Sequence, residues 1–312
     1  MSSTLADHFD RPVHIAVIGG TGLSKIEGYE PVAVLDITTP WGKPSAPIHI
    51  VEHNGVPIAF LARHGHHHQL APHEVPSRAN IAALRHIGVR CVIAFSAVGS
   101  LQEHIRPMDF LVPDQVIDRT KGVRPFTFFE GGVVGHVPFA DPFDSQLAAV
   151  VHRCAAAMRG DGVTLHDGGV LVCMEGPQFS TRAESHMYRS WGGSCINMSA
   201  LPEAKLAREA EMAYQMICMA TDYDCWRVGD ASEDVGVGMV LKYMEANSAN
   251  AKHLVGAVLD QLAHEEHGDL VLAKHYAGAS VQGLQFMTKP AGRNPEAVKR
   301  LEYLFPGVFG QN

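Results

Sequence analysis

The sequence has few cysteines, and no two of them have metal-binding or redox spacing. Its 312 residues include six scattered cysteines without a CxxC motif, which argues against a zinc ribbon or a thioredoxin-like site. Four of them stand in apolar runs, where a free thiol behaves as a small hydrophobe: Cys91, Cys173, Cys195 and Cys218. We therefore expect a reducing, intracellular environment. A cytoplasmic location, with the nucleus as a second compartment, is the matching prediction.

The sequence also lacks an excess of positive charge and any long apolar run. A formal net charge of −8 and a pI near 6.1 argue against a general nucleic-acid or membrane-surface binder, although they leave room for a local basic pocket. No stretch reaches the roughly 18 apolar residues of a membrane helix. Met1–Asp10 carries charges without an apolar core and predicts no signal peptide.

What is present is an ordinary globular composition, 46% hydrophobic and 19% charged, in which short apolar runs alternate with helical patterns. Strands are predicted at His14–Ile18, Ile48–Val51, Pro57–Leu61, Cys91–Phe95, Gly169–Cys173 and Gln215–Thr221, with one more over Phe110–Ile117. Helices are predicted at Ser77–His86, Gln146–Met158, Thr181–Trp191, Pro202 to about Ala213, and Val235–His267. The pattern predicts one α/β domain over residues 1–312, with a polar, mobile start at 1–11 and a C-terminal extension at about 290–312.

Polar residues follow four of the predicted strands. They are Gly19-Gly20-Thr21-Gly22, Arg63-His64, Ser96-Ala97-Val98-Gly99-Ser100, and the carboxylates Asp222 and Asp224. In open α/β sheets ligands gather outside the carboxyl ends of the strands. Three of these groups suit an anion and the fourth suits proton transfer, so the sequence favours a transferase with two substrates.

The three anion-binding candidates each have a plainer alternative. The glycine-rich turn matches neither the dinucleotide fingerprint nor the P-loop, and is either a phosphate-binding turn or a tight turn. Arg63 offers a planar fork that fits phosphate, or makes a structural ion pair. The run from Ser96 to Ser100 lets a ligand approach the backbone, or is a strand-to-helix turn. It contains no Gly-x-Ser-x-Gly elbow, which disfavours a serine hydrolase.

Four histidines follow Arg63-His64, at positions 66, 67, 68 and 73. Consecutive histidines on a loop rarely point at one ion, and no carboxylate stands at helical spacing with them. We therefore predict a solvated or substrate-facing loop rather than a metal site.

Asp222 and Asp224 would face the same side of a strand that continued through them. A buried carboxyl with a raised pKa can donate a proton to N7 of a departing purine, and a second carboxylate can accept from an exocyclic amine. A 6-oxo purine would instead need a donor such as Asn, so the pair favours adenine. The alternative is a charged turn or a helix cap.

A family resemblance rests on motifs spread between about residues 14 and 262. They are Ile18–Leu23, Leu61–Gly65 with Pro72 and Ala79–Ile81, Gly99-Ser100, Asp118–Thr120, Glu175–Ser180 with Arg182–Glu184, Ile196–Ser199 with Pro202-Glu203, and Met219–Trp226. The Glu-Gly-Pro and Asp-Tyr-Asp-Cys-Trp segments are the specific ones. On these motifs the sequence resembles the 5′-methylthioadenosine phosphorylases, in the trimeric purine nucleoside phosphorylase superfamily.

The resemblance implies a three-layer fold with a mixed, curved central sheet flanked by helices. It implies cleavage of 5′-methylthioadenosine by phosphate to adenine and 5-methylthioribose 1-phosphate, a step of methionine and purine salvage. It also implies that no metal or organic cofactor is needed, that phosphate is a co-substrate, and that three identical subunits share their active sites. Nucleic acid and membrane are not expected partners.

Position by position, the resemblance assigns roles to fourteen residues. Phosphate would be held by Thr21, Arg63, His64, Ser96, Ala97 and Ser199. The nucleoside would contact Met198 at the ribose, Phe179 and Ser180 at the purine, Asp222 at N7, Asp224 at the N6 amine, Val237 and Val240 at the 5′ end, and His136 from a neighbouring subunit. Ser96 and Ser199 stand where threonine is usual, and both keep the hydroxyl.

Four other functions stay open at this point. They are a 6-oxopurine nucleoside phosphorylase, a nucleosidase that uses water, a catalytically silent nucleoside-binding protein, and a metal protein built on the histidine loop. The carboxylate at Asp224 speaks against the first, and the phosphate-suited residues speak against the second.

Overall fold

A computed structural model describes residues 6–20, 29–159, 162–227, 237–285 and 288–309. The strands are β1 (Ile15–Gly19), β2 (Ala33–Leu35), β3 (Ile48–His53), β4 (Val56–Ala62), β5 (Cys91–Ser100), β6 (Phe110–Val112), β7 (Gln115–Arg119), β8 (Leu165–Asp167), β9 (Val170–Met174), β10 (Gly193–Asn197) and β11 (Ala213–Asp222). The helices are α1 (Ser77–His86), α2 (Ser145–Arg153), α3 (Arg182–Ser190), α4 (Ala200–Glu209), α5 (Val237–Leu262), α6 (Gly268–Val271), α7 (Ala279–Gln285) and α8 (Pro295–Leu304).

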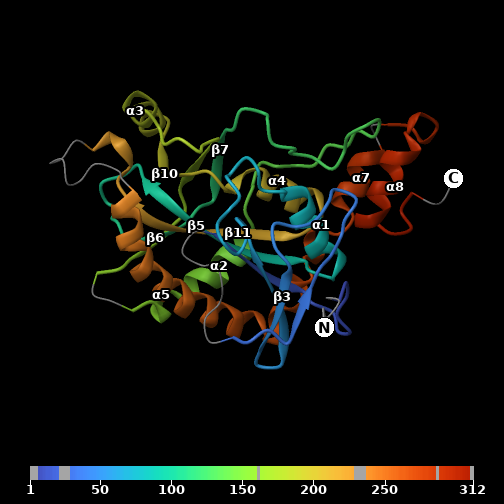
Figure 1. Cartoon of the computed structure of the whole chain (residues 1–312), viewed down its shortest axis with the longest axis horizontal. Helices are drawn as coiled ribbons and strands as arrows, with labels where there is room; N and C mark the ends of the chain where they lie inside the picture. The colour runs from blue at the N-terminus through green and yellow to red at the C-terminus, as the bar shows by residue number, and fades with distance from the viewer. Residues whose placement is uncertain (1–5, 21–28, 160–161, 228–236, 286–287, 310–312) are drawn as a thin grey trace.

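The strands form one mixed sheet that lies between two layers of helices. Its main order is β2-β3-β4-β1-β5-β10-β9-β7, and β11 pairs with both β5 and β6. Figure 1 shows α5 and α2 on one side of the sheet and α1, α4 and α8 on the other. The predicted fold class, a mixed central sheet flanked by helices, is confirmed.

Alternation along the central strands builds both layers of the core. In β1, Ile15 and Val17 face the cluster that includes α2 and α5, whereas Ala16 and Ile18 face the cluster that includes α1, α4 and α8. Because successive side chains of a strand point to opposite faces, a strand covered on both sides must be apolar throughout. This explains why His14–Ile18 and its neighbours read as unbroken apolar runs.

Strand β5 changes partners along its length, and this creates the gap in which the site lies. Cys91–Ala94 pairs with β1, but Gly99 and Ser100 pair with the antiparallel strand β10 on that same side. Between these two pairings, around residues 95–98, neither β1 nor β10 is hydrogen-bonded to β5. The prediction that the strand ends at Phe95 and turns was wrong, because Ser96–Ser100 continues β5.

Several local predictions are confirmed and two others are corrected. The Asn54-Gly55 hairpin joins β3 to β4, α1 has the predicted bounds, and Thr181 with Glu184 forms the predicted capping box of α3. Phe110–Ile117 makes two strands, because β6 pairs with β11 whereas β7 pairs with β9. The helix expected to reach about Ala213 ends at Glu209, and β11 begins at Ala213.

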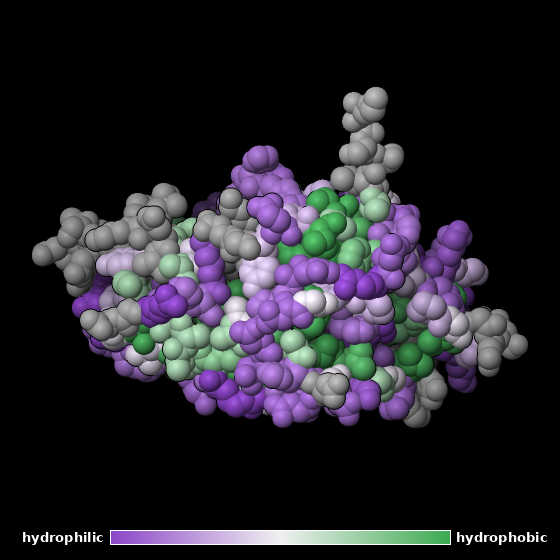
Figure 2. All heavy atoms as spheres, turned by 90° about the horizontal axis from the view of Figure 1, so that it is seen from below, coloured by the Kyte–Doolittle hydropathy of each residue, from purple (hydrophilic) through white to green (hydrophobic). Residues whose placement is uncertain are grey.

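Both described ends of the chain pack on this framework. Ala6 forms a bridge with Leu35, and Phe9 packs against the core. In the extension, Leu301 and Leu304 of α8 are buried in the cluster that includes α1. Figure 2 shows the face on the α5 side of the molecule, where hydrophilic side chains surround smaller hydrophobic areas. Among the described helices, none is long and apolar enough to cross a membrane.

Candidate active site

A cavity of about 870 Å³ opens where β1 and β10 diverge from β5. Its walls come from the ends of β1, β4, β5, β10 and β11, from the loop that follows β4, and from Met244 on α5. Nine predicted site residues line it: Arg63, His64, Ser96, Ala97, Phe179, Met198, Ser199, Asp222 and Asp224. The site thus lies at a topological switch point of the sheet, as expected for α/β folds.

Arg63 is buried, and it makes the ion pair that was the alternative to phosphate binding. Its Nε and Nη2 each lie 2.8 Å from a carboxylate oxygen of Glu203, and its Nη1 lies 2.7 Å from the carbonyl oxygen of Phe95. At Phe95, β5 pairs with β11 but has no neighbouring strand on the side of β1 and β10, and Arg63 supplies a donor to the Phe95 carbonyl there. A guanidinium has five N–H donors. Three of them have these partners, Tyr214 is a further hydrogen-bonding neighbour, and Arg63 still borders the cavity.

His64 is held as a neutral ring. Its Nδ1 lies 2.9 Å from the carbonyl oxygen of Leu70, which can only accept, so Nδ1 carries the hydrogen. Burial and the neighbouring charge of Arg63 lower the pKa of His64 to about 4. The second ring nitrogen, Nε2, is therefore a hydrogen-bond acceptor at neutral pH. Such a group suits a ligand oxygen that carries a hydrogen, as monohydrogen phosphate does.

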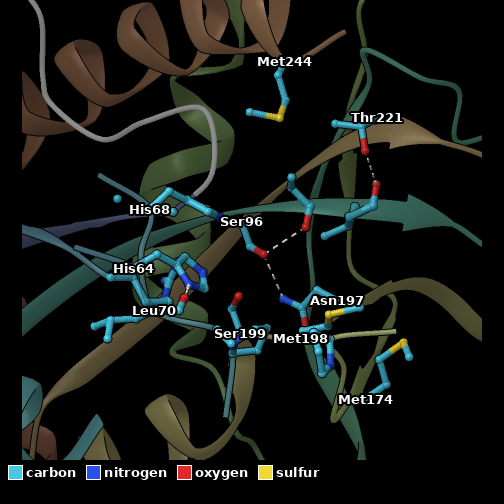
Figure 3. Close-up of a pocket in the computed structure, with 18 of the residues that line it drawn as sticks. His64, His68, Leu70, Ser96, Met174, Asn197, Met198, Ser199, Thr221 and Met244 are labelled. Atoms are coloured by element: carbon cyan, nitrogen blue, oxygen red, sulfur yellow. Dashed lines mark hydrogen bonds between the residues drawn. The ribbon is translucent and has the colours of Figure 1, made fainter. Parts of the chain in front are cut away.

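Two serine hydroxyls stand near His64 in Figure 3. Ser96 accepts a hydrogen bond from the Asn197 amide at 3.1 Å and donates to the Ala97 carbonyl at 3.0 Å. Ser199 occupies the N-cap position of α4, but its hydroxyl makes no capping hydrogen bond. The backbone of α4 is broken at Leu201 (φ −118°, ψ 138°), so what Ser199 offers an anion is its hydroxyl rather than the N-terminus of a continuous helix.

Asp222 ends β11 as a buried carboxyl inside the cavity wall. Thr221 donates its hydroxyl to one oxygen and the backbone N–H of Asp224 donates to the other, both at 2.8 Å. Burial raises the pKa of Asp222 to about 6, and the nearby Asp224 carboxylate contributes to the rise. A carboxyl with a pKa raised toward the working pH can act as a general acid.

Asp224 also lines the cavity, although the strand does not continue through it. Its backbone is left-handed, with φ of +47°, and a short 3₁₀ turn, Asp224–Trp226, begins there. The expectation of one strand face carrying both carboxylates was therefore wrong, and the turn brings them together instead. Ser185 of α3 donates to Asp224, and burial raises the pKa of Asp224.

The other predicted residues either do not line the cavity or fall outside the description. Ser180 is buried with its hydroxyl toward the Met174 sulfur, outside the lining. His136 is exposed on the segment between β7 and α2, and it does not line this cavity. Thr21 lies outside the described residues. Val237 and Val240 are on α5, but their side chains are outside the description.

The histidine loop borders the same cavity. His66 and His68 line it, and their rings lie against those of His49 and His64, respectively. Within the described parts of the chain, no three His, Cys, Asp or Glu side chains gather as a metal site would require.

Sequence reasoning gave no role to three residues that shape the site. Glu203 fixes Arg63, and Asn197 donates to Ser96. Arg124 donates to the carbonyls of Met198 and Leu201, which stand on either side of Ser199. A methyl group at Gly20 would lie 2.6 Å from Nη1 of Arg63, so this position needs glycine for close approach. Glu203 and Asn197 stood inside quoted motifs, which was a usable signal, whereas Arg124 had none.

Comparison with known proteins agrees with this geometry. Residues 14–260 match the family model described as Phosphorylase superfamily. An S-methyl-5′-thioadenosine phosphorylase of Neurospora crassa is 73% identical over 304 residues, covering 97% of this chain and 98% of that protein.

Two solved structures extend the likeness to three dimensions. A methylthioadenosine phosphorylase from an antarctic soil metagenomic library has a TM-score of 0.84 and 40% identity, covering 95% of this chain and 99% of that one. The Schistosoma mansoni methylthioadenosine phosphorylase, solved in complex with adenine, has a TM-score of 0.82 and 30% identity, covering 88% and 99%. The chain therefore belongs to the phosphorylase superfamily and, within it, to the family of the methylthioadenosine phosphorylases.

Proposed function

We propose that this chain catalyses the phosphorolysis of 5′-methylthioadenosine to adenine and 5-methylthioribose 1-phosphate, in methionine and purine salvage. The C1′–N9 bond breaks and a C1′–O bond to phosphate forms. Asp222 gives N7 of the departing purine a proton or a strong hydrogen bond. The hydrogen of monohydrogen phosphate then restores the proton balance between Asp222 and the products.

One observation carries this proposal: a carboxyl with a raised pKa lines the same cavity as a group of side chains that can bind an anion. Asp222, with its pKa raised to about 6, stands on the wall formed by β11. Arg63, Ser96 and Ser199 border the same space from β4, β5 and α4. Phosphate held by these groups would stabilise the ribosyl cation as the purine leaves, so that positioning and preorganised charge supply much of the rate.

The nucleoside is oriented by the remaining walls. Met198 lies against the ribose, Phe179 and Ser180 belong to the purine side, and Asp224 accepts from the N6 amine of adenine. Val237 and Val240 form the apolar 5′ end. Met244 of α5 supports this placement of the 5′ end, because it lines the cavity. It follows Val237 by seven residues and Val240 by four, and helix positions at these spacings lie on one face.

We also propose a homotrimer in which His136 reaches the active site of a neighbouring subunit. The segment that carries His136 exposes three large apolar side chains, Val123 (64% exposed), Phe126 (51%) and Val134 (48%), which suits a protein contact. The resemblance to the methylthioadenosine phosphorylases also supports a cytoplasmic enzyme that needs phosphate as co-substrate, with no metal or organic cofactor.

The test is release of adenine from 5′-methylthioadenosine by the purified protein, with and without inorganic phosphate, beside adenosine and inosine. We expect release that requires phosphate and is fastest with the methylthio substrate. Release without phosphate would reassign the protein as a nucleosidase. Cleavage of inosine alone would contradict the role given to Asp222 and Asp224, and binding without turnover would leave only a nucleoside-binding protein.

A further inference from the structure

Arg124 lies on the segment between β7 and α2, buried behind the active site. All five N–H donors of its guanidinium have partners, in contrast to a ligand-binding arginine. Nε donates to the Glu175 carboxylate, Nη1 to the carbonyls of Met198 (2.7 Å) and Leu201 (2.6 Å), and Nη2 to the carbonyls of Glu175 and Met174 (3.4 Å). Arg124 therefore has no donor left for a substrate.

These partners belong to two walls of the cavity. Met174 and Glu175 end β9 and lead into the loop whose Pro177 and Phe179 line the purine side. Met198 and Leu201 flank Ser199, whose hydroxyl belongs to the phosphate side. One side chain thus joins the loop on the purine side to the turn on the ribose and phosphate side.

The two walls touch where Arg124 holds them. A methyl group on Gly176 would lie 2.3 Å from the sulfur of Met198, and Gly176 has a left-handed φ of +69°. Any change in the spacing of the walls would therefore shift Met198 as well. The spacing is fixed by the hydrogen bonds of Arg124 because they reach backbone carbonyls, which cannot be rearranged by a change of rotamer.

The charge of Arg124 is balanced locally. Glu175 is buried beside it, and the second oxygen of that carboxylate accepts the backbone N–H of Lys121 at 2.6 Å. Lysine at position 124 would keep the charge but lose the planar fork, and could not bond the carboxylate and four carbonyls at once. Lys is therefore the substitution that separates the geometry of Arg124 from its charge.

We infer that Arg124 is a positioning residue for both substrates: it sets the distance between the purine wall and the ribose–phosphate wall without contacting either ligand. This inference rests on the proposed function. It predicts that weakening the clamp raises KM for the nucleoside and for phosphate together.

The experiment compares Arg124→Lys with Arg85→Lys in steady-state kinetics, thermal unfolding and mass in solution. Arg85 is a matched control, because it donates to the Ala210 carbonyl at 2.8 Å and joins α1 to the end of α4, away from the cavity. We expect Arg124→Lys to raise both KM values by about tenfold, with a smaller change in kcat. Arg85→Lys should lower Tm while both KM values stay within twofold of the wild type.

A milder variant keeps the test open if Arg124→Lys does not fold. Glu175→Gln preserves shape and should raise both KM values by about threefold. KM values within twofold of the wild type, at a lowered Tm, would make the clamp merely structural and overturn the inference. Raised KM values that appear only when the variant's mass in solution falls would also overturn the inference, since the loss of subunit contacts would then be the cause.

Direct titration with adenine separates this inference from the proposed function. Wild-type protein that binds adenine and turns over, beside an Arg124→Lys variant with equal affinity and equal KM values, would overturn the clamp alone. Wild-type protein that neither binds adenine nor cleaves the nucleoside would overturn the proposed function, and the inference with it.

Discussion

Two buried arginines border the small pocket behind Ser199, and they do different work. Arg63 pairs with Glu203 and with the Phe95 carbonyl, and it also lines the active-site cavity. Arg124 pairs with Glu175 and with backbone carbonyls through all of its N–H donors, and it does not line that cavity. Burial and an ion pair are common to both. Contact with the cavity is what distinguishes a residue that can hold a ligand from one that holds the site together.

The same distinction applies to the carboxylates. Glu203 and Glu175 both have an arginine partner and act as braces, whereas Asp222 faces the cavity without a cationic partner among its described contacts. Burial without a counter-charge raises the pKa of a carboxyl. A brace is held by its arginine, whereas the raised pKa of the cavity-facing Asp222 suits it to give a proton.

The largest expected effect comes from removing that acid. Asp222→Ala should lower turnover by about 10²–10⁴-fold, the usual contribution of a general acid, while the protein stays folded. Steady-state release of adenine, with a thermal unfolding scan as the control for folding, measures it. Near-normal turnover in this variant would remove Asp222 from the mechanism.

The next effect concerns the space that holds Arg63. In Gly20→Ala the new methyl group would lie 2.6 Å from Arg63 Nη1 and 2.7 Å from the Phe95 carbonyl oxygen. We expect lower stability and a KM for phosphate raised by about tenfold, because the guanidinium must move. The control is Gly256→Ala in α5, where no atom lies within 4 Å of the added methyl. This control should be neutral or stabilising by about 0.5–1 kcal/mol. Equal behaviour of the two variants would argue against a fixed Arg63.

The pH dependence of kcat/KM tests whether Asp222 acts as the acid, in contrast to the carboxylates that are paired with arginine. Because the pKa of Asp222 is about 6, its protonated form is lost as the pH rises above that value. We expect kcat/KM to fall above about pH 6 in the wild type, and this limb to disappear in Asp222→Asn. Phosphate titrates equally in both proteins, so the difference between the two profiles isolates Asp222. Identical profiles would contradict the assignment.

His64 links the phosphate side to stability. Its folded pKa of about 4 lies below the unfolded value of 6.5, so the unfolded chain binds the proton first as the pH falls. Stability should therefore be lost between pH 6.5 and 4, by about 3 kcal/mol from this group at the low end. Chemical denaturation at several pH values should find a smaller loss in His64→Gln. A loss of the same size in both proteins would place the acid sensitivity elsewhere.

The smallest effect is expected at a single hydroxyl. Ser199→Ala removes one donor to phosphate but no capping bond, since the hydroxyl makes none. KM for phosphate should rise by about five- to tenfold, with little change in Tm or in KM for the nucleoside. A change confined to the nucleoside would move Ser199 to the ribose.

Much of this site can be predicted from the sequence because its polar residues follow apolar strands directly. Arg63-His64 and Asp222 are of this kind, and the fold brings them to one cavity. The extent of β5 could not be predicted, because Ser and Gly at positions 96–100 look like a turn when the partner strand β10 is unknown. The left-handed backbone of Asp224 is likewise set by tertiary contacts rather than by local sequence.

Arg124 shows why braces escape sequence reasoning. Its partners are carbonyl groups 50 to 77 residues away, and a carbonyl gives no signal in the sequence because every residue has one. Only the folded chain reveals that these carbonyls converge on a single guanidinium.

The most direct test of the division between the two arginines is the pair of KM values in Arg63→Lys and Arg124→Lys. We predict that Arg63→Lys raises KM for phosphate at least tenfold more than KM for the nucleoside, because Arg63 lines the cavity beside the groups proposed to hold phosphate and lysine lacks its planar fork. In Arg124→Lys the two KM values should rise by factors within about threefold of each other. A selective loss of phosphate binding in Arg124→Lys, or an equal loss of both substrates in Arg63→Lys, would contradict the account.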